Sequence, residues 1–309
     1  MRILHVNDEA GVACILAKYQ QKIYGYDSEV IKLSRVDKYG IYEYYKEYVT
    51  QVKTEELFLS YIFNEAESTD IIHVHGRSDI VIKLRKKFRN SKKIILHYHG
   101  TDLRGIKNQK LPHRSRLSDT IIRLILTYRK GRDIILSGKK IKLNAQIVSD
   151  IVLVSTIDLL DYTALNNVKA IHLPNPIDIE HFRPNKEVFM RGGNGKAVTI
   201  DNEATDINMA LKYLKENNFD SEINIHDRMK QTINYQEMPE FLKQFDTYVD
   251  IRFINNKLIP DLSKTALEAL SCGLNVIDHR LNNLSGLPPQ HCPLTVVNTL
   301  SRIYKNILD

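Results

Sequence analysis

A repeated alternation between short apolar runs and longer amphipathic stretches is the feature that most constrains how this chain can fold. Residues 3–6 form a short apolar run, residues 12–24 carry apolar side chains at helical spacing, and residues 29–33 form a second run. Gly25 stands where the helical spacing ends. Short apolar runs are typical of buried strands, and strands that alternate with helices predict a parallel sheet with right-handed crossovers. The pattern therefore indicates an α/β protein.

The alternation continues on both sides of a proline-rich joint at residues 173–184. The strands expected elsewhere span residues 71–75, 93–99, 151–155, 170–173, 197–200, 222–226, 247–251 and 275–277, and the helices span residues 79–88, 205–216, 239–245, 263–272 and 298–308. Proline ends regular structure, and 309 residues are more than one core usually holds. We therefore predict two Rossmann-like, doubly wound domains, 1–176 and 177–309, with the last helix able to pack back toward the N-terminal domain.

The composition limits the class of partner and the compartment. The net charge is +7, which favours anionic partners such as nucleotide diphosphates, lipid phosphates, membrane surfaces or nucleic acid. Three cysteines, far apart, provide neither a disulfide framework nor zinc-ligand spacing. The first apolar run is too short for a signal peptide, and no window approaches the roughly 18 apolar residues of a spanning helix. We expect a soluble, cytoplasmic protein.

One segment, residues 114–142, combines many basic side chains with apolar ones. A basic amphipathic helix can lie in a membrane interface and attract anionic lipid. An ordinary helix that packs on the core and exposes a basic face would have the same composition. The segment therefore allows peripheral contact with a membrane but does not require it.

A polar loop follows the first predicted strand at residues 7–11 and ends at Gly11. Open α/β sheets bind ligands outside the carboxyl ends of their strands, and the N-terminus of the next helix offers free N–H groups to an anion. The loop has a single glycine, so it lacks the glycine pattern of dinucleotide-binding proteins. Gly11 is a candidate ligand-binding residue, and a plain connecting turn is the alternative.

Two His-x-His pairs, His73 with His75 and His97 with His99, fall in neighbouring predicted strands. Both faces of a parallel strand are buried, and only its end is open to a ligand. We therefore expect His73 and His97 to pack under helices, and His75 and His99, each followed by a glycine, to have exposed rings at strand ends. His99 is the stronger candidate for a functional role. A metal site made of these pairs is not expected.

The segment at residues 263–272 is the sharpest candidate for anion binding. Ser263 can cap a helix that Gly273 ends, and the N-terminus of such a helix favours a phosphate. Lys264 lies in the first turn, where its charge opposes the helix dipole, a placement that makes more sense if Lys264 meets an anion. Glu268 lies one turn further on the same face. The alternative is an ordinary surface ion pair between Lys264 and Glu268.

This segment resembles the signature of GT4-type retaining glycosyltransferases of the GT-B fold, also called glycosyl transferases group 1. The family pattern reads roughly E-x7-E-A-x-A-x-G-x-P-V-I, and residues 268–277 read E-A-L-S-C-G-L-N-V-I. Residues 70–76 (D-I-I-H-V-H-G), 97–102 (H-Y-H-G-T-D) and 150–156 (D-I-V-L-V-S-T) are similar to further motifs of the family. The joint at residues 173–184 is similar to the family's hinge, so the likeness covers nearly the whole chain.

The resemblance implies a GT-B enzyme, in which two Rossmann-like domains face each other across a cleft. The N-terminal domain would hold the acceptor, and the C-terminal domain would hold the nucleotide-sugar donor. The implied reaction moves a sugar from a UDP- or GDP-sugar to a glycan or lipid-linked acceptor hydroxyl, with retention and without a metal or other cofactor. Nucleic acid is not an implied partner.

By position in the motifs, the resemblance also implies roles for individual residues. Glu268 would hydrogen-bond the ribose of the nucleotide. Lys264 and the backbone of Thr265 would face the diphosphate. His99 would lie beside the transferred sugar as a catalytic residue, and the Gly11 loop would border the donor phosphates.

The sequence also departs from the family pattern. The first glutamate of the signature falls at Pro260, and Asp261 is the neighbouring carboxylate that could replace it. The family's G-R-x-x-x-x-K-G element is missing, and acidic residues stand in its place at 200–205. Donor phosphates would need other cations, of which Arg252 is one. An inactive binding or scaffold protein, or a sugar-nucleotide epimerase or hydrolase on the same fold, therefore remains an alternative.

Overall fold

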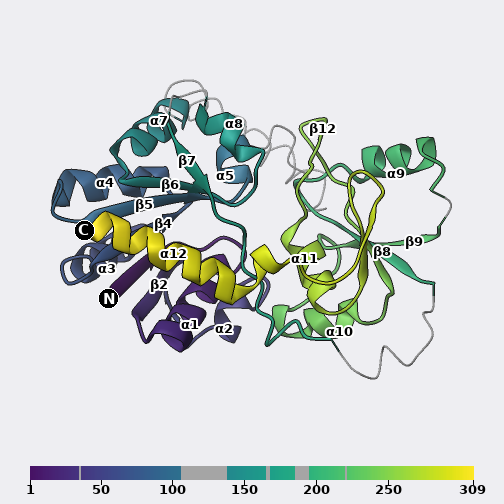
Figure 1. Cartoon of the computed structure of the whole chain (residues 1–309), viewed down its shortest axis with the longest axis horizontal. Coiled ribbons are helices and arrows are strands. Elements are labelled where there is room, and N and C mark those ends of the chain that lie inside the picture. The colour runs from purple at the N-terminus through teal and green to yellow at the C-terminus, as the bar shows by residue number, and fades with distance from the viewer. Residues whose placement is uncertain (35, 106–137, 165–167, 185–194, 220) are drawn as a thin grey trace, which may run out of the picture.

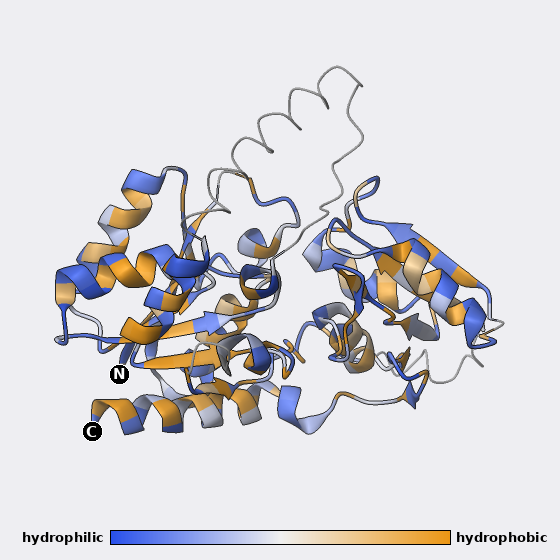
Figure 2. Ribbon diagram, turned by 90° about the horizontal axis from the view of Figure 1, so that it is seen from above, coloured by the Kyte–Doolittle hydropathy of each residue, from blue (hydrophilic) through white to orange (hydrophobic). Residues whose placement is uncertain are grey.

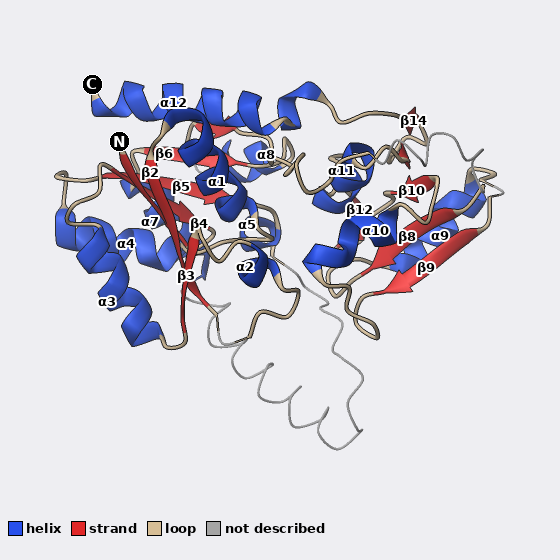
Figure 3. Ribbon diagram, turned by 90° about the horizontal axis from the view of Figure 1, so that it is seen from below, coloured by secondary structure: helices blue, strands red, loops and turns tan. Residues whose placement is uncertain are grey.

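The computed structural model describes residues 1–34, 36–105, 138–164, 168–184, 195–219 and 221–309 (Figure 1). Two separate sheets organise these residues, and helices cover both (Figure 3). The part of the basic segment that spans residues 114–137 lies outside the described residues. Among the described helices, none combines the length and the apolar character needed to cross a membrane.

The first sheet has seven parallel strands in the order β3-β2-β1-β4-β5-β6-β7. These strands are β1 (Arg2–Val6), β2 (Asp27–Leu33), β3 (Val49–Val52), β4 (Ile71–His75), β5 (Lys93–Tyr98), β6 (Ile151–Val154) and β7 (Ala170–His172). The helices of this half are α1 (Val12–Tyr24), α2 (Ile41–Tyr44), α3 (Glu55–Glu65), α4 (Ser78–Phe88), α5 (Thr101–Arg104), α7 (Gly138–Val148) and α8 (Leu159–Ala164). The chain order reverses between β1 and β4, which is where open α/β sheets bind ligands.

The second sheet is smaller, with the order β14-β13-β10-β8-β9. Its strands are β8 (Ala197–Asp201), β9 (Ile223–Asp227), β10 (Thr247–Val249), β13 (Asn275–Ile277) and β14 (Asn283–Leu284), and a separate hairpin pairs β11 (Phe253–Ile254) with β12 (Lys257–Leu258). The helices are α9 (Ile207–Glu216), α10 (Met238–Leu242) and α11 (Lys264–Ser271), with single 3-10 turns at Tyr235–Glu237 and Pro289–His291. Four strands are parallel, and only β14 runs antiparallel.

The α/β fold class predicted from the sequence is confirmed. Figure 2 shows hydrophobic strands in the interior of each half, between helices whose apolar sides face them. One core cluster runs from α1, through the joint, to α10 and α11, and a second fills the opposite face of the first sheet under α3 and α4. Strand β3 and helix α3 were not expected, because residues 49–65 carry too weak a periodicity to be recognised.

The C-terminal helix α12 (Pro293–Leu308) lies along α1 of the first half (Figure 1). Hydrogen bonds join Tyr24 to Asn298 at 2.6 Å and Tyr26 to Ser301 at 2.8 Å. The helix begins five residues earlier than the predicted start at 298, because Pro293 occupies its first turn, where a missing N–H costs nothing. The exact domain limits, 1–176 and 177–309, stay a prediction.

A buried carboxylate, Asp178, connects the proline-rich joint to the first half. Its side chain is fully buried and accepts hydrogen bonds from Lys18 Nζ at 2.8 and 2.9 Å, Tyr19 Oη at 3.0 Å and Tyr45 Oη at 2.8 Å. Burial alone would raise the pKa of Asp178, but the Lys18 ammonium and the tyrosine hydroxyls outweigh it and lower the pKa. Tyr45 Oη also lies 2.9 Å from Tyr235 Oη, which extends the contact to the second half.

Replacing Asp178 with Asn should destabilise the protein by about 3 kcal/mol, because the largely buried Lys18 ammonium then loses its fully buried partner and keeps only the more exposed Glu180. The measurement is the free energy of unfolding in urea at pH 7.5. Glu216→Gln is the control, since Glu216 forms an exposed pair with Lys212 and should change stability by less than about 1 kcal/mol. Equal stability of the two variants would show that Asp178 does not have this role.

Candidate functional site

The carboxyl ends of β1, β4, β5 and β6 meet at one edge of the first sheet. The loop after β1 carries Gly11, and the loop after β5 carries His99, so the structure brings these two predicted residues to the same edge. The register pairs His5 with His73 across β1 and β4, and His75 with His97 across β4 and β5. Side chains that are far apart in the sequence therefore lie close together here.

The loop after β1 has a constrained backbone that ends at the N-terminus of α1. Asn7, Ala10 and Gly11 all have positive φ angles, of 67°, 56° and 82°. A Cβ on Gly11 would lie 3.2 Å from Ile41, so a larger residue would be strained and crowded there. The Asp8 carboxylate accepts the N–H of Gly11 at 2.7 Å and that of Ala13 at 2.6 Å. An anion is thus already present at this end of the helix dipole, and a donor phosphate at Gly11 would compete with it.

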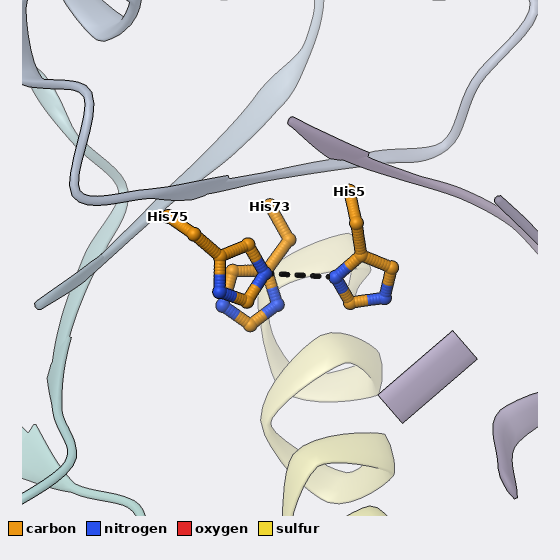
Figure 4. A group of neighbouring side chains, drawn as sticks. All are labelled: His5, His73 and His75. Atoms are coloured by element: carbon orange, nitrogen blue, oxygen red, sulfur yellow. Dashed lines mark hydrogen bonds between the residues drawn. The ribbon is translucent and has the colours of Figure 1, made fainter. Parts of the chain in front are cut away.

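Eight polar side chains form a closed ring of hydrogen bonds beneath α1 and α12, which we call the histidine circuit. Its members are His5 on β1, Gln20 on α1, His73 and His75 on β4, His97 on β5, His99 after β5, Ser155 after β6 and Tyr304 on α12. The distances between successive partners lie between 2.7 Å, for His73 and Tyr304, and 3.4 Å, for Gln20 and Tyr304. Figure 4 shows the bond between His5 and His75, with the His73 ring stacked on His75.

The direction of the circuit follows from the groups that can only accept. Gln20 Oε1 has no hydrogen, so His5 Nε2 donates to it, and His5 Nδ1 must then accept from His75 Nε2. If each imidazole is neutral, the same elimination assigns the proton of all five histidines to Nε2. Ser155 donates to His99 Nδ1 and accepts from His97 Nε2, while Tyr304 donates to His73 Nδ1 and accepts from Gln20 Nε2.

Burial keeps the imidazoles of the circuit neutral. It lowers the pKa of His5 to about 4, although the hydrogen bond to Gln20 acts in the opposite direction. Burial also lowers the pKa of His73, His75, His97 and His99, and for the first three the neighbouring imidazoles lower it further. The expectation that His75 has an exposed ring is wrong: its side chain is fully buried between His5 and His99. His73 packs under α12 through Tyr304.

The spacing of these rings also bears on metal binding. The ligand atoms of His5, His73 and His75 lie within 4.8 Å of one another, and so do those of His75, His97 and His99. Neutral imidazoles at such spacing are ligands for transition metals. Every ring nitrogen in the circuit already donates or accepts a hydrogen bond, so a metal ion would have to break several of them. The prediction that the protein holds no metal stays a prediction.

A second group of predicted residues meets on α11 in the other half. Ser263 caps this helix by accepting the N–H of Ala266 at 3.0 Å, and the N–H groups of Lys264 and Thr265 have no hydrogen-bond partner among the described residues. Lys264 forms an ion pair with Glu268, and its ammonium lies 5.3 Å from the centre of the Tyr235 ring. Glu268 is buried, so this is not an ordinary surface pair.

The remaining two predicted residues lie in the loop before α11. Asp261 Oδ2 accepts the N–H of Asp158, from the first half, at 3.4 Å, and Asp158 pairs with Arg104 at 2.6 Å. Burial and the neighbouring Asp158 carboxylate raise the pKa of Asp261. Arg252 hydrogen-bonds the carbonyl of Asp261, and its Nε lies 3.0 Å from Asp250, so its guanidinium already has partners inside the loop.

An acidic edge on the second sheet was missed by the sequence analysis. Aspartate ends β8 and β9 and directly follows β10 and β13, at Asp201, Asp227, Asp250 and Asp278. The aspartates at 227, 250 and 278 accept backbone N–H groups of the next turn or helix. The sequence signal was an aspartate after each apolar run. Arginines also stand at this edge, with Arg228 directly after Asp227 and with Arg252 and Arg280 two residues after Asp250 and Asp278, so its described residues carry both signs of charge.

Glu9, in the loop after β1, was also missed, although it lies among the polar residues of that loop. Burial raises its pKa to about 7, the nearby Asp102 and Asp8 carboxylates act in the same direction, and Lys32 opposes them. Gln20 and Tyr304 are two members of the histidine circuit that the sequence analysis also missed. Each is a polar residue on an otherwise apolar helix face, and the sequence gives no further signal for them.

Comparison with known proteins places the fold. No protein-family model matches the chain, and no curated protein is similar enough in sequence to match. HepE from Anabaena, solved in complex with UDP, aligns with a TM-score of 0.56 over 100% of this chain and 92% of its own, at 10% identity. An alpha-glucosyltransferase solved with UDP-glucose and DNA containing an abasic site aligns with a TM-score of 0.50 over 100% and 90%, also at 10% identity. The predicted GT-B arrangement of two Rossmann-like halves is confirmed.

The histidine circuit should make the fold sensitive to mild acid. Between pH 6.5 and 4 the unfolded chain binds a proton at each histidine that the folded chain excludes, so the free energy of unfolding falls as the pH falls. For His5 alone, the free energy of unfolding should fall by about 3 kcal/mol in total as the pH decreases through this range. Urea unfolding followed by circular dichroism between pH 7.5 and 5.5, above the range in which most carboxylates titrate, measures this dependence.

Two variants identify the source of the acid sensitivity. His5→Gln removes one histidine that binds a proton only in the unfolded chain, so the free energy of unfolding should depend less steeply on pH. His226→Gln, on edge strand β9 away from the circuit, should leave it unchanged. A free energy of unfolding that stays constant from pH 7.5 to 5.5 in the wild type would contradict neutral, buried imidazoles.

Proposed function

We propose that this protein transfers a sugar from a nucleoside-diphosphate sugar to an acceptor hydroxyl. The observation that carries the proposal is the first turn of α11, where the N–H groups of Lys264 and Thr265 have no hydrogen-bond partner among the described residues and Lys264 adds an ammonium that is paired with Glu268. The GT-B fold supports it, since HepE was solved with UDP and the alpha-glucosyltransferase with UDP-glucose. We further propose a GT4-like enzyme that retains the anomeric configuration and requires no metal.

The chemistry would depend on stabilising the departing diphosphate. Negative charge develops on the leaving oxygens as the bond to the sugar breaks, and N–H groups held by the helix cap would receive it without reorganisation. The ammonium of Lys264 would add a positive charge, turning from Glu268 toward the phosphates. Glu268 would then be free to accept hydrogen bonds from the ribose hydroxyls.

The other predicted residues fit around this arrangement as proposals. His99, in the first half, and Asp261, in the second half, would border the transferred sugar. The Gly11 loop would adjoin the acceptor. Arg252 would hold the loop before α11 through its hydrogen bond to Asp261. We propose a UDP- or GDP-sugar donor, a glycan or lipid-linked acceptor, and a cytoplasmic location with peripheral membrane contact through residues 114–142.

A catalytically inactive binding protein is the second candidate. The acidic edge formed by Asp201, Asp227, Asp250 and Asp278 favours it, because four carboxylates would repel a diphosphate, while Lys264 is already paired with Glu268 and Arg252 with Asp250. Titration calorimetry with UDP-, GDP- and ADP-sugars, followed by product analysis with and without acceptor, separates the two. Binding without turnover supports the second candidate, sugar modification without acceptor indicates an epimerase or hydrolase, and no binding overturns the enzyme proposal.

Replacing Glu268 with Ala should weaken nucleotide binding at least about tenfold, because a buried carboxylate that hydrogen-bonds a ribose is worth more than 1 kcal/mol. The dissociation constant for UDP or GDP, by calorimetry, is the measurement. Glu268→Gln should lose less, since the amide still hydrogen-bonds. Glu216→Ala, an exposed glutamate on α9 paired with Lys212, is the control. Unchanged affinity in both Glu268 variants, with an intact fold by circular dichroism, would place the nucleotide elsewhere.

A further inference from the structure

Transfer of a sugar to a hydroxyl releases a proton, and the edge where β1, β4 and β5 end holds several titratable side chains. His99 is the most obvious, but both of its ring nitrogens are used. Nε2 lies 2.9 Å from His75 Nδ1, and Nδ1 lies 2.8 Å from the Ser155 hydroxyl. A proton could enter His99 only by breaking the histidine circuit, and burial opposes the charge that would result.

Asp102 is held as firmly as His99. Its carboxylate accepts the N–H groups of His99, Gly100 and Leu103 at distances from 2.7 to 3.1 Å, and so closes the loop after β5. Both oxygens of Asp102 are thus occupied by N–H groups of its own loop. Asp102 therefore shapes the loop after β5 and is not the proton acceptor that we propose.

Glu9 lies at the same edge, and among the described residues only one of its two carboxylate oxygens forms a hydrogen bond. Its Oε1 accepts from Asn7 Nδ2 at 3.0 Å, whereas Oε2 forms no hydrogen bond with any described residue. A Cβ on Gly76 would lie 3.4 Å from Glu9 Oε1 and 3.0 Å from Asp102 Oδ2, so the two carboxylates flank the turn after β4. Glu9 is only partly buried, and the next residue, Ala10, is exposed, so a ligand can approach from the loop side.

The support under Glu9 is rigid. Asn7 Nδ2, the donor to Glu9, also donates to the carbonyl of His75 at 2.8 Å, and Asn7 Oδ1 accepts from Lys32 Nζ at 2.9 Å. Asn7 is thereby tied to β4 on one side and to β2 on the other. A carboxylate held at one oxygen by such a support presents its other oxygen in a defined direction.

The charged and titratable groups around Glu9 come from four elements. Asp8 lies on its own loop, Lys32 on β2, Tyr42 on α2 and Asp102 on α5. The ammonium of Lys32 also binds the carbonyl of Asp8 at 2.6 Å, so part of its charge is already used. Burial, with the two aspartates, therefore prevails over Lys32 and raises the pKa of Glu9 to about 7. A carboxylate of this kind takes up and releases a proton near neutral pH, as a general base requires.

We propose that Glu9 is the catalytic base, whose Oε2 accepts the proton of the acceptor hydroxyl. The inference rests on the proposed glycosyl transfer. The acceptor oxygen forms a bond to the anomeric carbon from the face that the diphosphate leaves, as retention requires, the bond from that carbon to the diphosphate oxygen breaks with its electron pair, and the hydroxyl proton passes to Glu9. The products are the glycosylated acceptor, the free nucleoside diphosphate and protonated Glu9, which then loses its proton to water.

The test is the variant Glu9→Gln. Its amide oxygen can still accept the hydrogen bond from Asn7, but the side chain cannot take up a proton. In the wild type, kcat/KM should rise with pH through an apparent pKa of about 7, because Glu9 must be ionised. In Glu9→Gln, kcat should fall about 10²- to 10⁴-fold and this step in the pH profile should disappear. Nucleotide affinity should stay within about threefold of the wild type, since the proposed nucleotide residues are on α11.

Glu43→Gln is the matched control. Glu43 is an exposed carboxylate on α2, paired only with Lys46 among the described residues, and its loss should change neither kcat nor the pH profile. The carboxyl carbon of Glu9, followed by NMR in the wild type and assigned by its absence in Glu9→Gln, should titrate near pH 7 without any substrate. A titration near pH 4.5 would overturn the assignment.

The failure of this inference differs from the failure of the proposed function. If the wild type transfers no sugar from any donor, the proposed function fails. If the wild type is active and a folded Glu9→Gln variant keeps its kcat and its pH profile, the function stands and Glu9 is not the base. Circular dichroism and nucleotide affinity show whether the variant has folded.

Discussion

The arrangement of the whole molecule depends on the buried Asp178 carboxylate in the joint between the two halves. A fully buried charge is tolerated only where enough donors surround it, and Asp178 has the Lys18 ammonium and the hydroxyls of Tyr19 and Tyr45. Through Tyr45 the same network reaches Tyr235, which lies beside Lys264 of α11. The position of α11 relative to the ends of β1 and β5 therefore follows from how the joint satisfies one charge.

The histidine circuit shows a second way in which buried polar groups specify a structure. Three strands, the loops after β5 and β6, and two helices contribute its members, and a single direction of donation satisfies every one of them. A network that is complete rigidifies its surroundings, whereas an incomplete one would be costly in the same low dielectric. Both nitrogens of His99 are used within the circuit. Glu9, which lies at the same edge, has one carboxylate oxygen that no described residue hydrogen-bonds, and it is therefore the better candidate to receive a proton.

Much of the fold was predictable because it depends on patterns within a few residues. The parallel sheets followed from apolar runs alternating with helical spacing, and the helix at residues 264–271 followed from Ser263 as its cap and Gly273 beyond its end. Other elements were not predictable on this basis. Strand β3 is short with two exposed central residues, and α3 has weak amphipathic character, so tertiary contacts rather than local pattern decide their structure.

The sequence by itself determined that His75 and His99 lie at the ends of neighbouring strands, because the apolar runs stop there. It also determined that Lys264 and Glu268 lie on one helix face, because that relation is set by helical spacing. Only the tertiary structure decided what these groups contact. The pairing of β1, β4 and β5 brings five imidazoles to hydrogen-bonding distance, and Tyr304 reaches them from the far end of the chain. Burial then sets their protonation, since solvent exposure depends on packing between distant segments and not on local sequence.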